Sequence, residues 1–298
     1  LQQPGPLVAV ELRPPRSDLE PEDGMGAWID LHHSLGRLTS DDLFVFLTDN
    51  AVGGAEEENL AHVGANVGED VDLRRIIPIL TTKHSVDYCM MFASRAQSEG
   101  FDALTVLGGD KSVGVPRCVP HGRDLRELLR ERLPDLVLGG WANPHRDAEE
   151  QVAFLTADDA TTDFALTQVV SHHSLAGVER FLERMHEVGA TVPTVFGVFF
   201  YRSANPRTLE ALGGFFPVPA EEVTHEFESA SAEEISVCWR RPRFRLVDLL
   251  VRMCCLLDLL RMTLPLAVVL KRLAAPRWVF IFGMSTISPK LRQKHRNP

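Results

Sequence analysis

The chain has 298 residues, of which 45% are hydrophobic and 24% are charged, and its formal net charge is −10. This composition is typical of a globular chain with a large core, folded as one domain or two smaller ones, and the negative charge argues against nucleic acid as a general partner. The five cysteines form no CxxC pair and show no zinc-site spacing, which predicts reduced thiols in a cytoplasmic protein.

Short apolar runs recur along the chain and predict seven β-strands, at residues 7–12, 43–48, 76–81, 103–107, 136–140, 164–170 and 194–200. Continuous apolar runs are typical of strands buried on both faces, as in parallel sheets. Helical patterns follow several of them, at residues 85–98, 124–132, 174–188 and from Ala220 onward. Strand–helix units in series predict a (β/α)8 barrel. The eighth strand is uncertain, and residues 278–282 are its best candidate.

Polar residues follow most of the predicted strands. In a (β/α)8 barrel the residues at the carboxyl ends of the strands form the active site. The candidates chosen on this basis are Glu11, Thr48, Thr81, Gly109, Asp110, Asn143, His145, Gln168 and Tyr201. Two long loops, 49–70 and 108–123, follow predicted strands, and loops of this length are usually functional.

The composition changes near residue 236, which predicts a barrel body over 1–235 and a distinct segment over 236–298. That segment carries thirteen Lys or Arg residues against two Asp residues. Its apolar stretch, 246–270, contains two acids and two arginines, so we expect no membrane span there. Two interpretations stay open: an amphipathic helix that covers a core, or a sequence that has departed from its ancestral reading frame. The acidic body and basic segment also permit self-association into a homo-oligomer.

Five sequence blocks, in order, resemble the methylenetetrahydrofolate reductase family. They are VELRPPR, PILTT, ALTVLGGD, WANPHRDAEEQ and the stretch from TDFALTQVV to TVFGV, and together they cover about residues 7–235. The resemblance implies a (β/α)8 barrel that reduces methylenetetrahydrofolate to methyltetrahydrofolate by hydride transfer from NAD(P)H, with FAD as the family's cofactor. It implies that Glu11 is the general acid and that Asp110 and Gln168 contact the folate. Tyr201 is then assigned to the substrate. The residues assigned to the cofactor are Thr48, Thr81, Gly109, Asn143 and His145.

The chemistry of the three substrate residues agrees with these roles. A Glu11 carboxyl between apolar Val10 and Leu12 is expected to have a raised pKa, as a proton donor needs. A carboxylate such as Asp110 and an amide such as Gln168 can pair with the donors and acceptors of a pterin edge. The alternatives are an ion pair of Glu11 with a nearby arginine and a turn or capping role for Asp110. For Gln168, the cost of burying an unpaired amide favours function.

The chain departs from the family pattern mainly where the flavin binds. Gly108 stands where the family has an arginine for the FAD phosphate, Ile79 replaces a histidine, and residues 151–167 contain no lysine. We therefore predict weak or no FAD binding and direct hydride transfer from a nicotinamide cofactor to the folate.

Other residues could serve different chemistry. We expect His145 and Arg146 to begin a helix and either to hold an anion or to cap the helix. We expect Lys83 to be an exposed ligand for anionic groups rather than a Schiff-base lysine. A metal site is not expected, because His172 and His173 would point in opposite directions on a strand. The rival to an enzyme is a non-catalytic folate-binding subunit that serves a methyltransferase.

Overall fold

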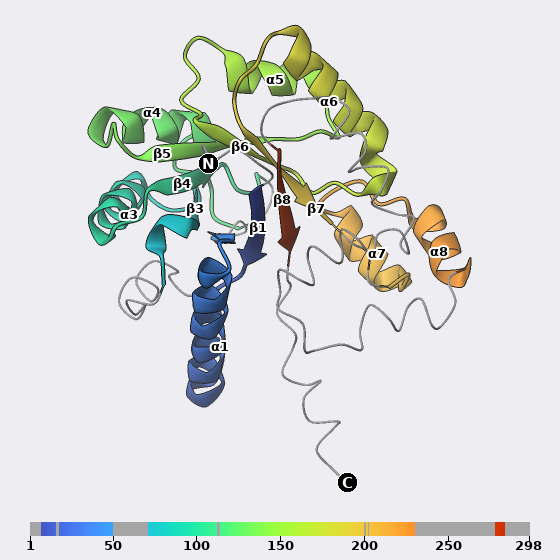
Figure 1. Cartoon of the computed structure of the whole chain (residues 1–298), viewed down its shortest axis with the longest axis horizontal. Helices are drawn as coiled ribbons and strands as arrows, with labels where there is room; N and C mark the ends of the chain where they lie inside the picture. Colours follow the sequence, from blue (N-terminus) through green and yellow to red (C-terminus); the bar gives the residue numbers. More distant parts are fainter. Residues whose placement is uncertain are drawn as a thin grey trace. The chain divides into compact units, whose positions relative to one another are not determined.

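The computed structural model describes residues 7–15, 18–49, 71–111, 114–199, 201, 203–229 and 278–283. Two compact units contain them, and the boundary lies between Gly140 and Trp141. The first unit includes the described residues from Val8 to Gly140, and the second includes those from Trp141 to Ser229. Strands and helices alternate along both parts of the chain, which confirms the predicted α/β class (Figure 1).

The first unit is a parallel sheet with helices in its connections. Its elements are β1 (Leu7–Leu12), α1 (Pro21–Ser40), β2 (Phe44–Leu47), η1 (Leu73–Arg75), β3 (Ile76–Thr81), α3 (Val86–Glu99), β4 (Ala103–Leu107), α4 (Gly122–Arg132) and the start of β5 (Val137–Ala142). Each strand pairs in parallel with the next one along the chain. The carboxyl ends of these strands therefore lie along one edge of the sheet, which is where the polar candidates were expected.

The sequence explains why these segments form. Every residue of β3 is buried, as expected for a strand covered on both faces. Helix α3 begins after Ser85, whose hydroxyl accepts from the Tyr88 backbone N–H at 3.2 Å. It ends at Gly100, which adopts φ 97°, a left-handed conformation that glycine reaches without strain.

The second unit contains two paired strands, four α-helices and one 3₁₀ helix among its described residues up to Ser229. Its elements are α5 (Ala148–Thr156), β6 (Phe164–Thr167), η2 (His172–Ser174), α6 (Leu175–Glu187), β7 (Thr194–Val198), α7 (Pro206–Gly213) and α8 (Ala220–Ser229). Strands β6 and β7 are parallel, and α5 packs beside α6 (Figure 1). The core includes Phe181 and Phe196, whose rings meet edge to face with centroids 6.2 Å apart.

A tight backbone contact fixes the start of α6 against the preceding turn. A Cβ added to Gly177 would lie 2.6 Å from the carbonyl oxygen of Pro144, far inside van der Waals contact. Gly177 is therefore required by the close approach of the Pro144 carbonyl, and a larger residue would force the two segments apart.

The predicted strands agree with the structure at β1, β3 and β4, and differ in their ends at β2, β5, β6 and β7. Strand β5 continues to Ala142, because the Ala142 carbonyl accepts from the Gln168 backbone N–H at 2.8 Å. Strand β6 ends at Thr167 rather than at 170, and the ladder resumes only as an isolated bridge between Val170 and Val198.

Two local predictions were wrong. His172 and His173 lie in the 3₁₀ helix η2 and not in a strand, so the argument from alternating strand faces does not apply to them. Helix α5 begins at Ala148, and its N-cap is Asp147, which accepts from the Glu150 backbone N–H at 2.9 Å. His145 and Arg146 therefore precede the helix instead of beginning it.

Strand β8 (Trp278–Gly283) covers the run chosen as the candidate eighth strand. Closure of the strands into a (β/α)8 barrel remains a prediction. The apolar stretch 246–270 lies outside the described residues, and so does most of the predicted segment 236–298. Among the helices of the described ranges, none has the length and apolar character that crossing a bilayer requires.

Candidate functional site

Glu11 lies near the carboxyl end of β1, where its backbone is in register with Phe46 of β2. Val10 and Leu12 on either side are buried, and Glu11 itself is only partly exposed. Burial raises the pKa of the Glu11 carboxyl from its ordinary value of 4.5, because loss of water disfavours the charged form. The expected direction of the pKa is therefore confirmed. A carboxyl that keeps its proton at higher pH is suited to donate it, and the role of Glu11 as the acid remains a prediction.

Asp49 joins the carboxyl ends of β2 and β3. Its Oδ2 accepts from the Thr81 backbone N–H at 2.8 Å and from the Thr81 hydroxyl at 3.0 Å. The same oxygen lies 2.9 Å from Nε2 of His84. The Asp49 side chain is 13% exposed, so these bonds to its carboxylate are shielded from water and hold both partners in place.

His84 completes this group, which we call the Asp49 cluster (Asp49, Thr81 and His84). Its ring stacks on Tyr88, with centroids 4.5 Å apart, at the start of α3. The cluster therefore ties two strand ends to a helix and places an imidazole beside a carboxylate. Thr81, which was predicted to contact a cofactor, instead uses both its hydroxyl and its backbone N–H on Asp49.

Lys83 and Arg117 both form hydrogen bonds that hold the loop after β4. Lys83 donates from Nζ to the Val115 carbonyl at 2.8 Å, and its side chain is almost fully buried. The prediction that Lys83 is an exposed ligand for anions is therefore wrong, because the loop covers it. The Thr82 hydroxyl also donates to this loop, to the Gly108 carbonyl at 2.9 Å.

Arg117 occupies the space beside Gly108. A Cβ on Gly108 would lie 2.8 Å from the guanidinium carbon of Arg117. The guanidinium donates to the Gly109 carbonyl and, at 3.0 Å, to the Pro120 carbonyl. A cation is thus present at the end of β4 although residue 108 is glycine, and it comes from the loop. Gly109 has φ 68°, and the partly buried Asp110 follows it.

In the second unit, Asn143 and His145 organise the turn between β5 and α5. The Asn143 backbone N–H donates to the Gln151 side-chain oxygen at 2.8 Å, and its own Oδ1 accepts from the His145 backbone N–H at 3.0 Å. Nε2 of His145 lies 2.8 Å from the Val169 carbonyl. Both side chains predicted for the cofactor therefore contact the protein backbone.

The Gln168 side chain also contacts the protein backbone. Its amide nitrogen donates to the Phe215 carbonyl at 3.0 Å, and its amide oxygen accepts from the Val169 backbone N–H at 2.9 Å. These bonds satisfy the amide that the sequence predicted to be costly to bury. They also place Phe215, which is 66% exposed, beside the end of β6.

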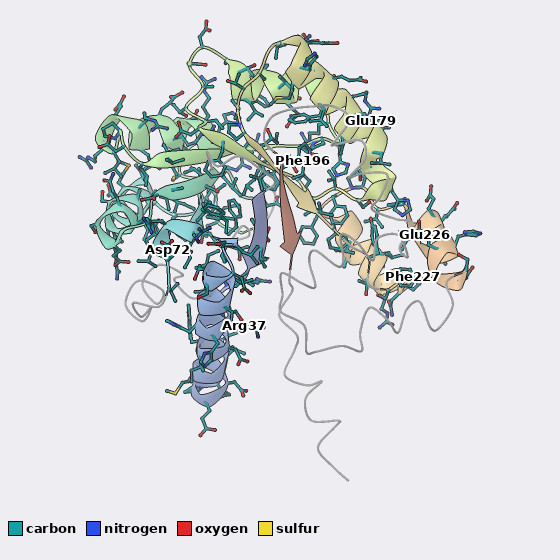
Figure 2. The ribbon with its side chains drawn as sticks, in the orientation of Figure 1. Arg37, Asp72, Glu179, Phe196, Glu226 and Phe227 are labelled. Atoms are coloured by element: carbon teal, nitrogen blue, oxygen red, sulfur yellow. The ribbon has the colours of Figure 1, made fainter. Side chains whose placement is uncertain are left out.

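Tyr201 follows β7 and is buried among aromatic rings. It meets Phe199 edge to face at 5.2 Å and His173 at 6.1 Å. Burial raises the pKa of the Tyr201 hydroxyl, the neighbouring Ser171 side chain opposes this rise, and the charge of Glu226 adds to it. Glu226 and Phe227 extend from α8 (Figure 2), and Glu226 lies 3.5 Å from Nε2 of His173.

Within each unit the structure gathers only some of the predicted residues. In the first unit Thr81 joins Asp49 and His84, two residues that were not chosen as candidates. In the second unit Asn143 contacts His145, which in turn reaches the segment beginning with Gln168. The sequence does contain a signal for this group. Two titratable residues follow closely after adjacent strands, Asp49 after β2 and His84 after β3.

Comparison with known proteins shows similarity at the level of structure. No family model matches the chain, and no curated protein matches it. An uncharacterized protein from Clostridium thermocellum that binds two copies of 5-methyl-5,6,7,8-tetrahydrofolic acid is similar, with TM-score 0.59 and 15% identity. The match covers 97% of this chain and 92% of that one. At this identity the likeness shows the fold alone.

Weaker likenesses extend to other solved structures. A putative dihydrodipicolinate synthase family protein from Coccidioides immitis has TM-score 0.42 and 11% identity, with 80% of each chain covered. A D-glucarate dehydratase from Agrobacterium tumefaciens has TM-score 0.41 and 16% identity, covering 67% of this chain and 48% of that one. These scores carry no weight for function.

Proposed function

We propose that this chain is a (β/α)8-barrel oxidoreductase of one-carbon metabolism that reduces 5,10-methylenetetrahydrofolate to 5-methyltetrahydrofolate. The observation that carries the proposal is Glu11, a carboxyl at a strand end whose pKa is raised by burial. It occupies the position that the resemblance assigns to the proton donor. The folate ligand of the similar Clostridium thermocellum protein supports the choice of substrate class.

The chemistry needs an acid at this position. Opening the five-membered ring of methylenetetrahydrofolate requires a proton on the bridging nitrogen, which leaves an electrophilic methylene iminium. A nicotinamide cofactor supplies the hydride that reduces this carbon. Glu11 donates the proton, and its partly buried setting keeps the carboxyl neutral to higher pH than an exposed glutamate.

The remaining predicted residues hold or recognise ligands in this proposal. Asp110 pairs with the donor edge of the pterin. Gln168 binds folate only if its amide releases the Phe215 carbonyl, which is a cost of about 1 kcal/mol unless the ligand replaces that bond. Asn143 and His145 act mainly by fixing the turn after β5, since their side chains contact the backbone.

The described residues do not fit the flavin that the family uses. A side chain at residue 108 would require the Arg117 guanidinium to move, and Arg117 directs its terminal nitrogens to the carbonyls of Gly109 and Pro120. We therefore propose that the chain works without FAD, in the cytoplasm, with NADH or NADPH as the direct hydride donor.

The test is oxidation of NADH and NADPH by flavin-free full-length protein with methylenetetrahydrofolate, repeated after addition of FAD. Methyltetrahydrofolate formed without flavin supports the proposal, and turnover only with FAD overturns the flavin-free part of it. Folate binding without turnover in either condition supports the second candidate, a non-catalytic folate-binding subunit. Absence of both binding and turnover contradicts both functions.

A further inference from the structure

Two cysteines of the first unit lie against the same short segment of chain. Cys89 is fully buried in the first turn of α3, and its sulfur lies 3.7 Å from the Thr81 carbonyl oxygen. Cys118 lies in the loop after β4, and its backbone N–H donates to the carbonyl of the next residue, Thr82, at 2.7 Å. Thr81 and Thr82, consecutive residues at the end of β3, therefore each hold one of the two cysteines through a carbonyl group.

The two thiols also interact with each other. The Cys118 thiol is one of the neighbouring groups that raise the pKa of the Cys89 thiol, so the two side chains lie within interaction range of each other. The pKa of the Cys89 thiol rises to about 12, first because burial removes its water and then because of the Cys118 thiol and the charge of Asp49. Both cysteines are free thiols in the structure, and Cys118 is the more exposed of the two.

We propose that Cys89 and Cys118 form a reversible disulfide that ties α3 to the loop after β4. The reaction removes two electrons and two protons from the two thiols, and a low-molecular-mass disulfide such as oxidised glutathione accepts them and becomes two thiols. The Cys118 thiolate attacks first, because it is accessible, and releases one glutathione as it forms a mixed disulfide. Cys89 then attacks the Cys118 sulfur and releases the second glutathione.

The bond would close a loop that carries functional candidates. Several contacts already hold the loop, among them those of Lys83 with Val115 and of Arg117 with Gly109 and Pro120. These are hydrogen bonds, which open and close, whereas a disulfide holds its ends permanently until it is reduced. Oxidation would therefore restrict the segment that contains Gly109 and Asp110. This modification site does not depend on the proposed reductase activity.

The inference also makes a kinetic prediction. Because Cys89 is a weak acid, the second step is slow at neutral pH, and its rate is expected to rise by about tenfold per pH unit between pH 7 and pH 9. The mixed disulfide on Cys118 should accumulate transiently at pH 7 and disappear faster at pH 9.

The test uses the full-length chain with Cys238, Cys254 and Cys255 changed to Ser, since these three lie outside the described residues. The protein is treated with oxidised glutathione, alkylated, digested with trypsin and analysed by mass spectrometry without reduction. The expected product links the tryptic peptides 84–95 and 118–123, which contain Cys89 and Cys118. Dithiothreitol should separate the linked peptides.

Two matched variants complete the experiment. Cys89→Ala should stop at a stable glutathione adduct on Cys118, and Cys118→Ser should leave Cys89 unmodified because it is buried. The proposal is overturned if the chain with both cysteines keeps Cys89 alkylatable after denaturation while Cys118 carries glutathione. It is also overturned if neither cysteine reacts, because the accessible thiol is then not available.

Discussion

The two units use polar residues at their strand ends in different ways. In the first unit, the Asp49 carboxylate accepts from Thr81 and contacts His84, and Glu11 is a carboxyl whose pKa is raised by burial. In the second unit, the side chains of His145 and Gln168 are directed to backbone carbonyls. The first unit thus places a carboxyl with a raised pKa and an Asp–His pair at its strand ends, whereas the side chains after β5 and β6 in the second unit hold the backbone. Similar residue types after strands do not by themselves mean similar roles.

The difference between the two units is tested most directly by removing the proposed acid, Glu11. Glu11→Gln should lower the turnover of methylenetetrahydrofolate by about 10²- to 10⁴-fold, the usual contribution of a general acid. Folate affinity should stay within about twofold, since the amide has the same shape. Turnover and equilibrium binding measure the two effects, and the exposed Glu20→Gln is the control. Equal loss of binding and turnover would show that Glu11 has a structural role.

The Asp49 cluster gives the next largest effect. Asp49→Ala leaves the Thr81 hydroxyl and backbone N–H without their acceptor, and should lower the free energy of unfolding by about 2–4 kcal/mol. The exposed Asp135→Ala should change it by less than about 0.5 kcal/mol. Urea unfolding measures both variants. A small effect of Asp49→Ala would mean that the cluster does not hold the strand ends together.

The close contact between Gly177 and the Pro144 carbonyl is tested by a substitution at Gly177, with a control substitution at Gly26 in a helix of the first unit. Gly177→Ala puts a Cβ against the Pro144 carbonyl and should destabilise the protein by about 1–3 kcal/mol. Gly26→Ala in α1 has open space around the new methyl group and should stabilise by about 0.4–1 kcal/mol. Opposite signs of the change in unfolding free energy are expected. Stabilisation by both substitutions would contradict the close approach at Gly177.

The smallest effect is expected at Gln168. Gln168→Glu removes the donor to the Phe215 carbonyl and should cost about 0.5–1.5 kcal/mol of stability. Phe215→Ala keeps that carbonyl and removes only an exposed ring, so it should cost less than about 0.5 kcal/mol. Thermal unfolding distinguishes the two variants. A larger cost for Phe215→Ala would mean that the ring, and not the backbone carbonyl, matters for stability.

The sequence predicted the elements better than the contacts between them. Strand β3 and helix α3 could be recognised because their signals are local: a continuous apolar run, a serine cap and a terminal glycine. The end of β5 was misplaced because Ala142 pairs with Gln168, far along the chain. Contacts between residues far apart in the sequence also limited the prediction of the candidate site. Glu11 was found from its apolar neighbours, whereas the pairing of Asp49 with His84 depends on two strands meeting.

The central claim is that burial raises the pKa of the Glu11 carboxyl, and the pH dependence of stability tests it directly. Because the folded pKa lies above the ordinary 4.5, the folded chain binds more protons than the unfolded chain between these two values. The free energy of unfolding of the native chain, relative to that of Glu11→Gln, should therefore fall as pH rises through this window and then level off. A constant difference between the two proteins from pH 4 to pH 8 would contradict the account.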